Sequence, residues 1–221
     1  MLIRLFKYVL SIFLMLTNSC IVYHPQIIDI PLISKKNDLR IDAGISIFPS
    51  VNATVSYGLT DKIALQAFGS LGSDERYYFQ GATGIFKKYD NQKIMEIYGG
   101  YGYGYGRVPD NSDPGGLYCD YQQYFLQINY GKIDCKFANM DYGLGLKAGL
   151  FHSNMYFHPY SETTYFDNNL LIEPTLFLRL GGERLKFNIK LGGCLFNKFT
   201  ISSNGLPYSN INFGLGLNYI F

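Results

Sequence analysis

The chain has 221 residues, which is enough for one sizeable domain or two small ones. Only 16% of its residues are charged, and the formal net charge of +2 is too small to favour a nucleic-acid partner. A typical soluble domain has about 25% charged residues. Tyr, Phe and Gly are abundant at 20, 17 and 24 residues, and Trp is absent, which indicates a β-rich and unusually apolar protein.

The N-terminus has the layout of a secretory signal. A basic stretch precedes an apolar run from Tyr8 to Leu16, which is shorter than the roughly 20 residues that span a bilayer. The polar residues that follow lead to Cys20, and this resembles a lipoprotein signal, although Leu16 lies four residues before the cysteine instead of three. We expect residues 1–19 to be removed, Cys20 to be lipidated and residues 20–38 to form a periplasmic tether, with threading or packing of residues 22–36 at the periplasmic mouth as the alternative arrangement. A plain cleaved signal with an incidental cysteine is the alternative.

The remaining cysteines give no sign of a disulfide framework or a metal site. They are Cys119, Cys135 and Cys194, an odd number without any CxxC or Cys/His cluster. We therefore expect isolated thiols, with no metal and no cofactor.

Glycine and tyrosine alternate through residues 98–108. Because successive side chains of a strand point to opposite faces, the pattern predicts one strand with Tyr101, Tyr103 and Tyr105 on one face and glycines on the other. A phosphate-binding loop would need a helix after the glycines, whereas Pro109 begins a stretch typical of a loop. The alternation therefore favours a strand over a phosphate site.

The same alternation continues over most of the chain after residue 38. One face has long aliphatic and aromatic side chains, and the other has Gly, Ser, Thr and Asn with few charges. The outer face of a soluble β-sandwich would carry many charges. A small polar face opposite an apolar face is typical of a transmembrane β-barrel, in which closure leaves no unpaired strand edge.

We predict a closed antiparallel transmembrane β-barrel over residues 39–221. Its ten expected strands are 39–48, 51–59, 63–71, 77–88, 93–107, 121–131, 136–151, 170–181, 184–196 and 210–221. The fourth strand is weakly patterned and the eighth contains Pro174, which removes a hydrogen-bond donor, so eight strands is the alternative. Connections after even-numbered strands are short, and residues 108–120 and 152–169 form the longest loops. Bacterial outer-membrane barrels have short periplasmic turns, which predicts that both termini are periplasmic.

The chain ends in GLGLNYIF. Gly216, Tyr219 and Phe221 resemble the glycine, hydrophobic and terminal aromatic positions of the sorting signal of outer-membrane barrels. Gly214 stands where that signal usually has a polar residue.

Four segments together carry a resemblance to a known family: YHPQIIDIPLISKKNDLRIDAGIS, VSYGLTDKIALQAFGS, IYGGYGYG and LIEPTLFLRLGGERLKFNIKLG. The chain resembles the small lipidated outer-membrane barrels of Bacteroidota over nearly its whole mature length. The resemblance implies a fold and a location, with lipid as a partner, but no established activity.

The polar face includes charged residues that we expect to point into the lumen. They are Arg40, Asp42, Glu96, Lys147, Glu173, Arg179, Lys186 and Lys190. Isolated charges would be costly in a narrow barrel, so a salt-bridged network that fills the lumen is favoured over the selectivity lining of a pore.

Catalytic patterns are weak. Residues 143–148 fit a dinucleotide fingerprint but lie on an expected strand, where no helix follows. His152 and Ser153 are adjacent, and adjacent strand residues point to opposite faces. We expect a non-enzymatic lipoprotein of the bacterial outer membrane, anchored by lipid at the periplasmic side. It would act structurally or as an accessory subunit of a larger barrel or membrane machine, with a narrow pore or an adhesin-like surface-binding barrel as alternatives. A lipid-modifying enzyme or protease ranks last.

Overall fold

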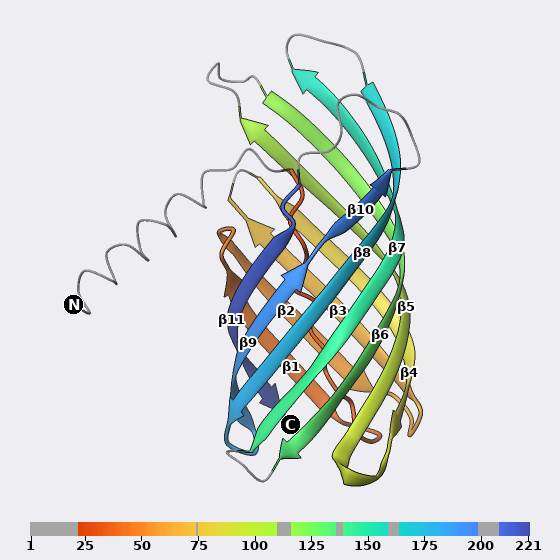
Figure 1. Cartoon of the computed structure of the whole chain (residues 1–221), viewed down its shortest axis with the longest axis vertical. Coiled ribbons are helices and arrows are strands. Elements are labelled where there is room, and N and C mark those ends of the chain that lie inside the picture. Colours follow the sequence, from red (N-terminus) through yellow and green to blue (C-terminus); the bar gives the residue numbers. More distant parts are fainter. Residues whose placement is uncertain (1–21, 74, 110–115, 136–138, 159–163, 199–207) are drawn as a thin grey trace, which may run out of the picture.

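The structure is a computed structural model that describes residues 22–73, 75–109, 116–135, 139–158, 164–198 and 208–221. The expected signal peptide and Cys20 lie outside these residues. Neighbouring strands pair antiparallel all the way round a closed barrel (Figure 1). The strands are β1 (Leu39–Ser46), β2 (Ser50–Gly58), β3 (Ile63–Gly72), β4 (Tyr77–Lys88), β5 (Lys93–Pro109), β6 (Gly116–Cys135), β7 (Met140–His158), β8 (Thr164–Gly181), β9 (Leu185–Gly193), β10 (Leu195–Lys198) and β11 (Ile211–Ile220).

β9 and β10 are two parts of one strand, so the barrel has the ten strands that the sequence predicts. β9 and β10 both pair with β8, and β9 closes the ring against β11. Thr175 pairs with Gly192 and Ile172 with Leu195, which is one unbroken register. The pairing lapses between them because Pro174 has no backbone N–H to donate.

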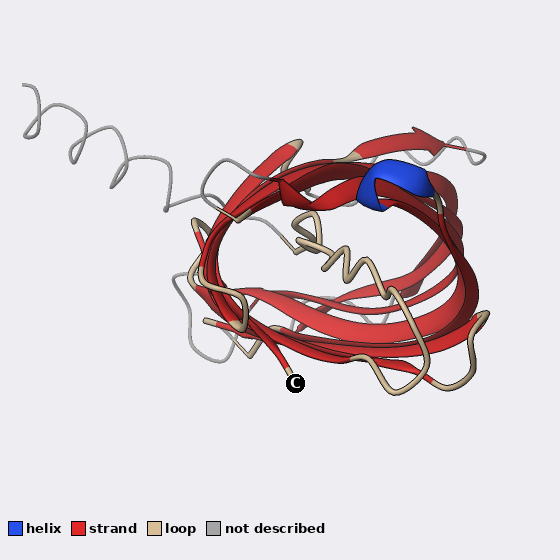
Figure 2. Ribbon diagram, turned by 90° about the horizontal axis from the view of Figure 1, so that it is seen from below, coloured by secondary structure: helices blue, strands red, loops and turns tan. Residues whose placement is uncertain are grey.

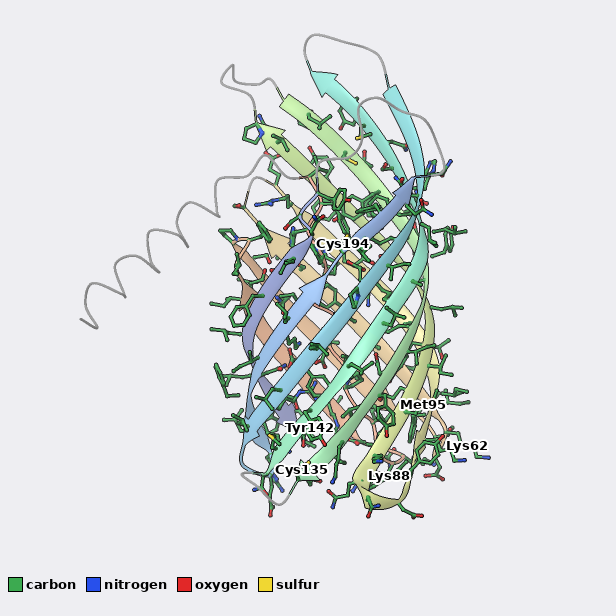
Figure 3. The ribbon with its side chains drawn as sticks, viewed as in Figure 1. Lys62, Lys88, Met95, Cys135, Tyr142 and Cys194 are labelled. Atoms are coloured by element: carbon green, nitrogen blue, oxygen red, sulfur yellow. The ribbon has the colours of Figure 1, made fainter. Side chains whose placement is uncertain are left out.

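The two mouths of the barrel differ in their connections. Residues 59–62, 89–92, 136–139 and 182–184 connect strands at the mouth where the C-terminus also lies, which we call the short-turn mouth (Figure 1). The exposed Lys62 and Lys88 lie at this mouth (Figure 3). The strand ends that precede the three longest connections, at Pro109, His158 and Lys198, lie at the other mouth, the long-loop mouth. A 3₁₀ turn at Asp90–Gln92 belongs to one short connection. No helix among the described residues is long and apolar enough to cross a membrane.

The loops expected at 108–120 and 152–169 are shorter than predicted. β5 runs to Pro109, β6 begins at Gly116, β7 runs to His158 and β8 begins at Thr164. The strands continue because the β5–β6 and β6–β7 hydrogen-bond registers extend as far as the Pro109–Gly116 and Gly116–His158 pairs. Most of the expected loop therefore belongs to the barrel wall.

The barrel is apolar outside and polar inside, as the alternation predicts. Ile45, Val51, Leu126 and Leu150 are each at least 60% exposed on the outer wall. Inward neighbours such as Thr54 are almost completely buried. This is the arrangement of a barrel whose outer surface contacts lipid.

The segment before β1 lies inside the barrel. Residues 22–33 are buried on every side, and the segment runs through the ring of strands (Figure 2). We call residues 22–38 the plug. The sequence suggested a periplasmic tether instead, so this placement differs from the expectation. The barrel itself begins and ends at the short-turn mouth, where Phe221 N donates to Leu39 O.

The alternating tyrosines and glycines of β5 follow from this inside-out geometry. Tyr101 points outward and is 41% exposed, whereas Gly102 and Gly104 face the lumen. A Cβ atom at Gly102 would collide with the hydroxyl of Tyr78, and one at Gly104 with the ring of Tyr121. The inward glycines therefore make room for tyrosines from neighbouring strands.

Glycines in other strands make room for the plug, and this can be tested at Gly145 in β7. A Cβ there would lie 2.7 Å from Ile30 Cδ1, whereas a Cβ at the outward-facing Gly81 would meet nothing within 4 Å. We expect Gly145→Val to destabilise the barrel by about 1–3 kcal/mol through overpacking, and Gly81→Val to leave it unchanged. The measurement is the temperature at which the fast-migrating folded form is lost on SDS gels. Equal temperatures for the two variants would contradict a packed plug.

Candidate functional site in the barrel lumen

All eight charged residues assigned to the lumen from sequence are buried, with at most 5% of each residue's surface exposed. The structure brings them together in several clusters along the lumen, and the plug contributes to most of these. Two barrel residues outside the original set, Asp141 and the half-exposed Asp134, also take part. The lumen is therefore a single candidate site whose parts come from the wall and from the plug.

Asp29 is the central acidic residue of the plug. Its Oδ1 lies 2.7 Å from Arg179 Nη2 and 3.1 Å from Lys190 Nζ. Arg179 Nη2 also donates to the carbonyl of Ile30 at 2.7 Å. Lys190 is shared with Asp42 of β1 at 2.6 Å. One carboxylate of the plug thus joins cations from β8 and β9, which lie next to each other in the wall.

A second cluster surrounds Glu173 on β8. Its Oε2 forms an ion pair with Lys147 Nζ at 2.6 Å, and its Oε1 accepts hydrogen bonds from the Tyr23 hydroxyl at 2.7 Å and from Gln26 N at 3.0 Å. Lys147 Nζ also donates to Gln123 Oε1 at 3.0 Å. The carboxylate therefore receives donors from both the wall and the plug, which compensates for its complete burial.

The plug is also held where it approaches the short-turn mouth. Ile33 N donates to Glu96 Oε1 at 2.6 Å, and Asn129 Nδ2 donates to the other oxygen of that carboxylate at 2.9 Å. Asp38 pairs with Arg40 at 3.2 Å and accepts from Ser34 N at 2.8 Å. Burial alone would raise the pKa of Asp38, but Arg40 and the hydrogen bonds from Ser34 hold this pKa below its ordinary value.

Aromatic rings surround the other end of the plug. The ring of Tyr23 meets those of Tyr121, Phe151 and Phe196 edge to face, with centroids 5.0–5.5 Å apart. Edge-to-face contacts of this kind stabilise a packed cluster beyond the area that they bury. Tyr121 lies in β6 and points into the lumen.

Lys186 forms a separate cluster within the wall. Its Nζ lies 2.6 Å from Asp141 Oδ1 and 3.2 Å from Asp134 Oδ1. The backbone N–H of Asp134 donates to the same Asp141 oxygen at 2.9 Å. These residues close the β6–β7 turn and need no contact with the plug.

Sequence reasoning missed the plug residues Asp29, Asp38 and Tyr23. One signal was available, because the expected lumen set contained five basic residues and only three acidic ones. Such an imbalance in a buried space calls for further carboxylates. Asp141, Asp29 and Asp38 supply them.

Gly216 and Tyr219 lie on β11, and the ring of Tyr219 contacts that of the exposed Phe221 at a centroid distance of 4.7 Å. His152 Nδ1 lies 2.6 Å from Asn168 Oδ1, whereas Ser153 is buried on the opposite face. The pair therefore has no shared geometry for nucleophilic catalysis.

The three cysteines that the structure describes are free thiols. Cys119 and Cys194 are buried in the aromatic cluster around Tyr23. Cys135 lies at the short-turn mouth, well away from Cys194 (Figure 3). Among the described residues, no group of three or more His, Cys, Asp or Glu side chains is arranged to hold a metal ion.

Comparisons with known proteins find only distant structural similarity. No family model matches the chain, and no curated protein matches it. The chain is similar to the N-terminal β-barrel domain of Pseudomonas aeruginosa OprF, with 14% identity over 84% of this chain and 98% of that one and a TM-score of 0.36. It is also similar to the KdgM porin, with 12% identity over 83% and 99% and a TM-score of 0.40. The same porin in complex with disordered oligogalacturonate matches at 13% identity, over 83% and 99%, with a TM-score of 0.39. Similarity at this level assigns neither a family nor a function.

The role of Asp29 can be tested by substitution. We expect Asp29→Asn to lower the free energy of unfolding by about 3 kcal/mol, because Arg179 loses its carboxylate partner while both remain buried. Asp61→Asn, at an exposed turn, is the matched control and should have no effect. The measurement is urea unfolding of the barrel in detergent micelles. A loss no larger than that of the control would contradict the assigned role.

Proposed function

We propose that the protein is a non-enzymatic β-barrel lipoprotein of the bacterial outer membrane, closed to solutes, that acts structurally or as an accessory subunit of a larger membrane complex. The observation that carries this proposal is the occupied lumen. The plug fills the barrel from one mouth to the other, and the described lumenal cations have carboxylate partners. A resident segment held by buried ion pairs favours a closed barrel over an open pore.

The outer-membrane location is supported by the distribution of side chains. The outer wall is apolar on every strand that forms the ring, while the polar and charged residues lie inside. A closed ring leaves no strand edge unpaired in hydrocarbon. The signal layout before Cys20 and the aromatic C-terminus fit the same location.

An accessory role is supported by an aromatic area on the outer wall of β4, β5 and β6. The rings of Tyr77 and Tyr105 stack at 5.6 Å, and those of Tyr101 and Tyr124 lie 5.0 Å apart. Rigid aromatic rings on an exposed wall are suited to packing against another protein.

The closed state can be tested by conductance. We expect the purified full-length protein to be silent in planar bilayers, because a ten-stranded barrel has a narrow lumen and the plug occupies it. A variant that lacks residues 22–33 and keeps its fast-migrating folded form on SDS gels should conduct. It should favour anions, because Arg179 loses its partner Asp29. Conductance by the full-length protein would contradict a closed barrel and favour the pore.

The accessory role can be tested by affinity purification of the tagged protein from its native membrane in mild detergent. We expect a stoichiometric membrane partner, identified by mass spectrometry, that is lost from the Tyr101→Leu/Tyr124→Leu variant. Tyr130→Leu/Tyr142→Leu changes two other exposed tyrosines of the outer wall and should retain the partner. A protein that purifies alone would overturn the accessory role and leave the structural one.

A further inference from the structure

The direction of the plug shows where the chain enters the lumen. At its start, Tyr23 pairs in parallel with Tyr208, and Ser209 N donates to Tyr23 O at 3.1 Å. Tyr208 belongs to the connection between β10 and β11, which lies at the long-loop mouth. The carbonyl of Val22 lies over Gly106, near the end of β5 at the same mouth. The described part of the plug therefore begins at the long-loop mouth.

The plug ends at the opposite mouth. Asn37 N donates to Gly58 O at 2.8 Å, and Gly58 N donates to Asp38 O at 2.9 Å. Gly58 is the last residue of β2, at the short-turn mouth. Between the two ends, residues 22–33 are buried throughout, and Ile27 and Ile30 lie against Gly214 and Gly145 of the wall. The plug thus crosses the full lumen in one direction.

Two residues are too few to reach from Val22 to the short-turn mouth. Cys20 lies two residues before Val22, so their Cα atoms are at most about 8 Å apart. A return path outside the barrel would have to cross an apolar band of about 25 Å, and the lumen is already filled by the plug. Cys20 therefore stays close to the long-loop mouth.

We propose that the mature N-terminus emerges at the cell surface and that the acyl chains on Cys20 insert into the outer leaflet of the outer membrane. This inference rests on the proposed function, which gives the barrel its membrane and its orientation, since outer-membrane barrels place short turns in the periplasm and long loops outside. It reverses the periplasmic anchoring expected from the sequence. The protein would then be a surface lipoprotein whose own barrel carries its N-terminus across the membrane.

A protease-accessibility experiment on the full chain tests this. A thrombin site is placed between residues 21 and 22, and the cells are fed an alkyne-bearing palmitate that labels acylated cysteine. We expect thrombin added to intact cells to cut the chain and to remove all acyl label from the barrel band, to the same extent as in permeabilised cells. Cys20→Ser should abolish the label while leaving the cleavage unchanged.

Two matched insertions define the sides of the membrane. The same site in the 110–115 connection should be cut in intact cells, and the site between Gly182 and Glu183, in the β8–β9 turn, should be cut only after permeabilisation. Cleavage at the N-terminal site only after permeabilisation would overturn the proposal. So would a site that resists thrombin in both conditions, because the N-terminus would then not emerge. A chain that is cut from outside but carries no acyl label at Cys20 would overturn the lipid anchor.

Failure of the proposed function would look different. A chain that lacks a heat-modifiable folded form in the outer-membrane fraction would fail as an outer-membrane barrel, whatever the cleavage pattern. A folded barrel in that fraction whose N-terminal site is cut only from the periplasm would leave the proposed function intact and overturn this inference alone.

Discussion

The pairing of Asp29 with Arg179 and Lys190 is the interaction on which the interior depends. Buried charges in a narrow barrel are costly unless each has a partner, and the wall alone provides more basic than acidic groups. The plug supplies the missing carboxylate at the centre, and its backbone donates to Glu173 and Glu96. The wall and the plug are therefore complementary parts of one core, because charged groups of the wall pair with a carboxylate and with backbone donors of the plug.

This core explains the uneven use of glycine. Outward positions have large apolar side chains because they face lipid. Inward positions have to leave space for the plug as well as for side chains from other strands of the wall. Gly145 and Gly214 lie against isoleucines of the plug, while Gly102 lies against the hydroxyl of Tyr78. The same residue type thus serves two purposes along the lumen, depending on whether plug or wall occupies the space.

The barrel was predictable from the sequence, whereas the plug was not. Strands that are apolar on one face and polar on the other repeat every two residues, and this gave the ten strands and the inward charges. The plug is buried on all sides, so no alternation marks it, and Pro25 and Pro31 make it read as a linker. The long-loop ends of β6 and β7 were also missed because hydrogen-bond register, and not hydrophobicity, determines them.

The position of the plug also constrains how the molecule is made. The ribosome produces residues 22–38 before any strand, but the seam between β1 and β11 can pair only after the final residues exist. If the plug were threaded through a finished ring, its charged residues would have to move along the lumen without their ion-pair partners. A seam that closed around a chain already in place would form these ion pairs as the ring is completed, and the plug would then act as an internal template for the circumference of the barrel.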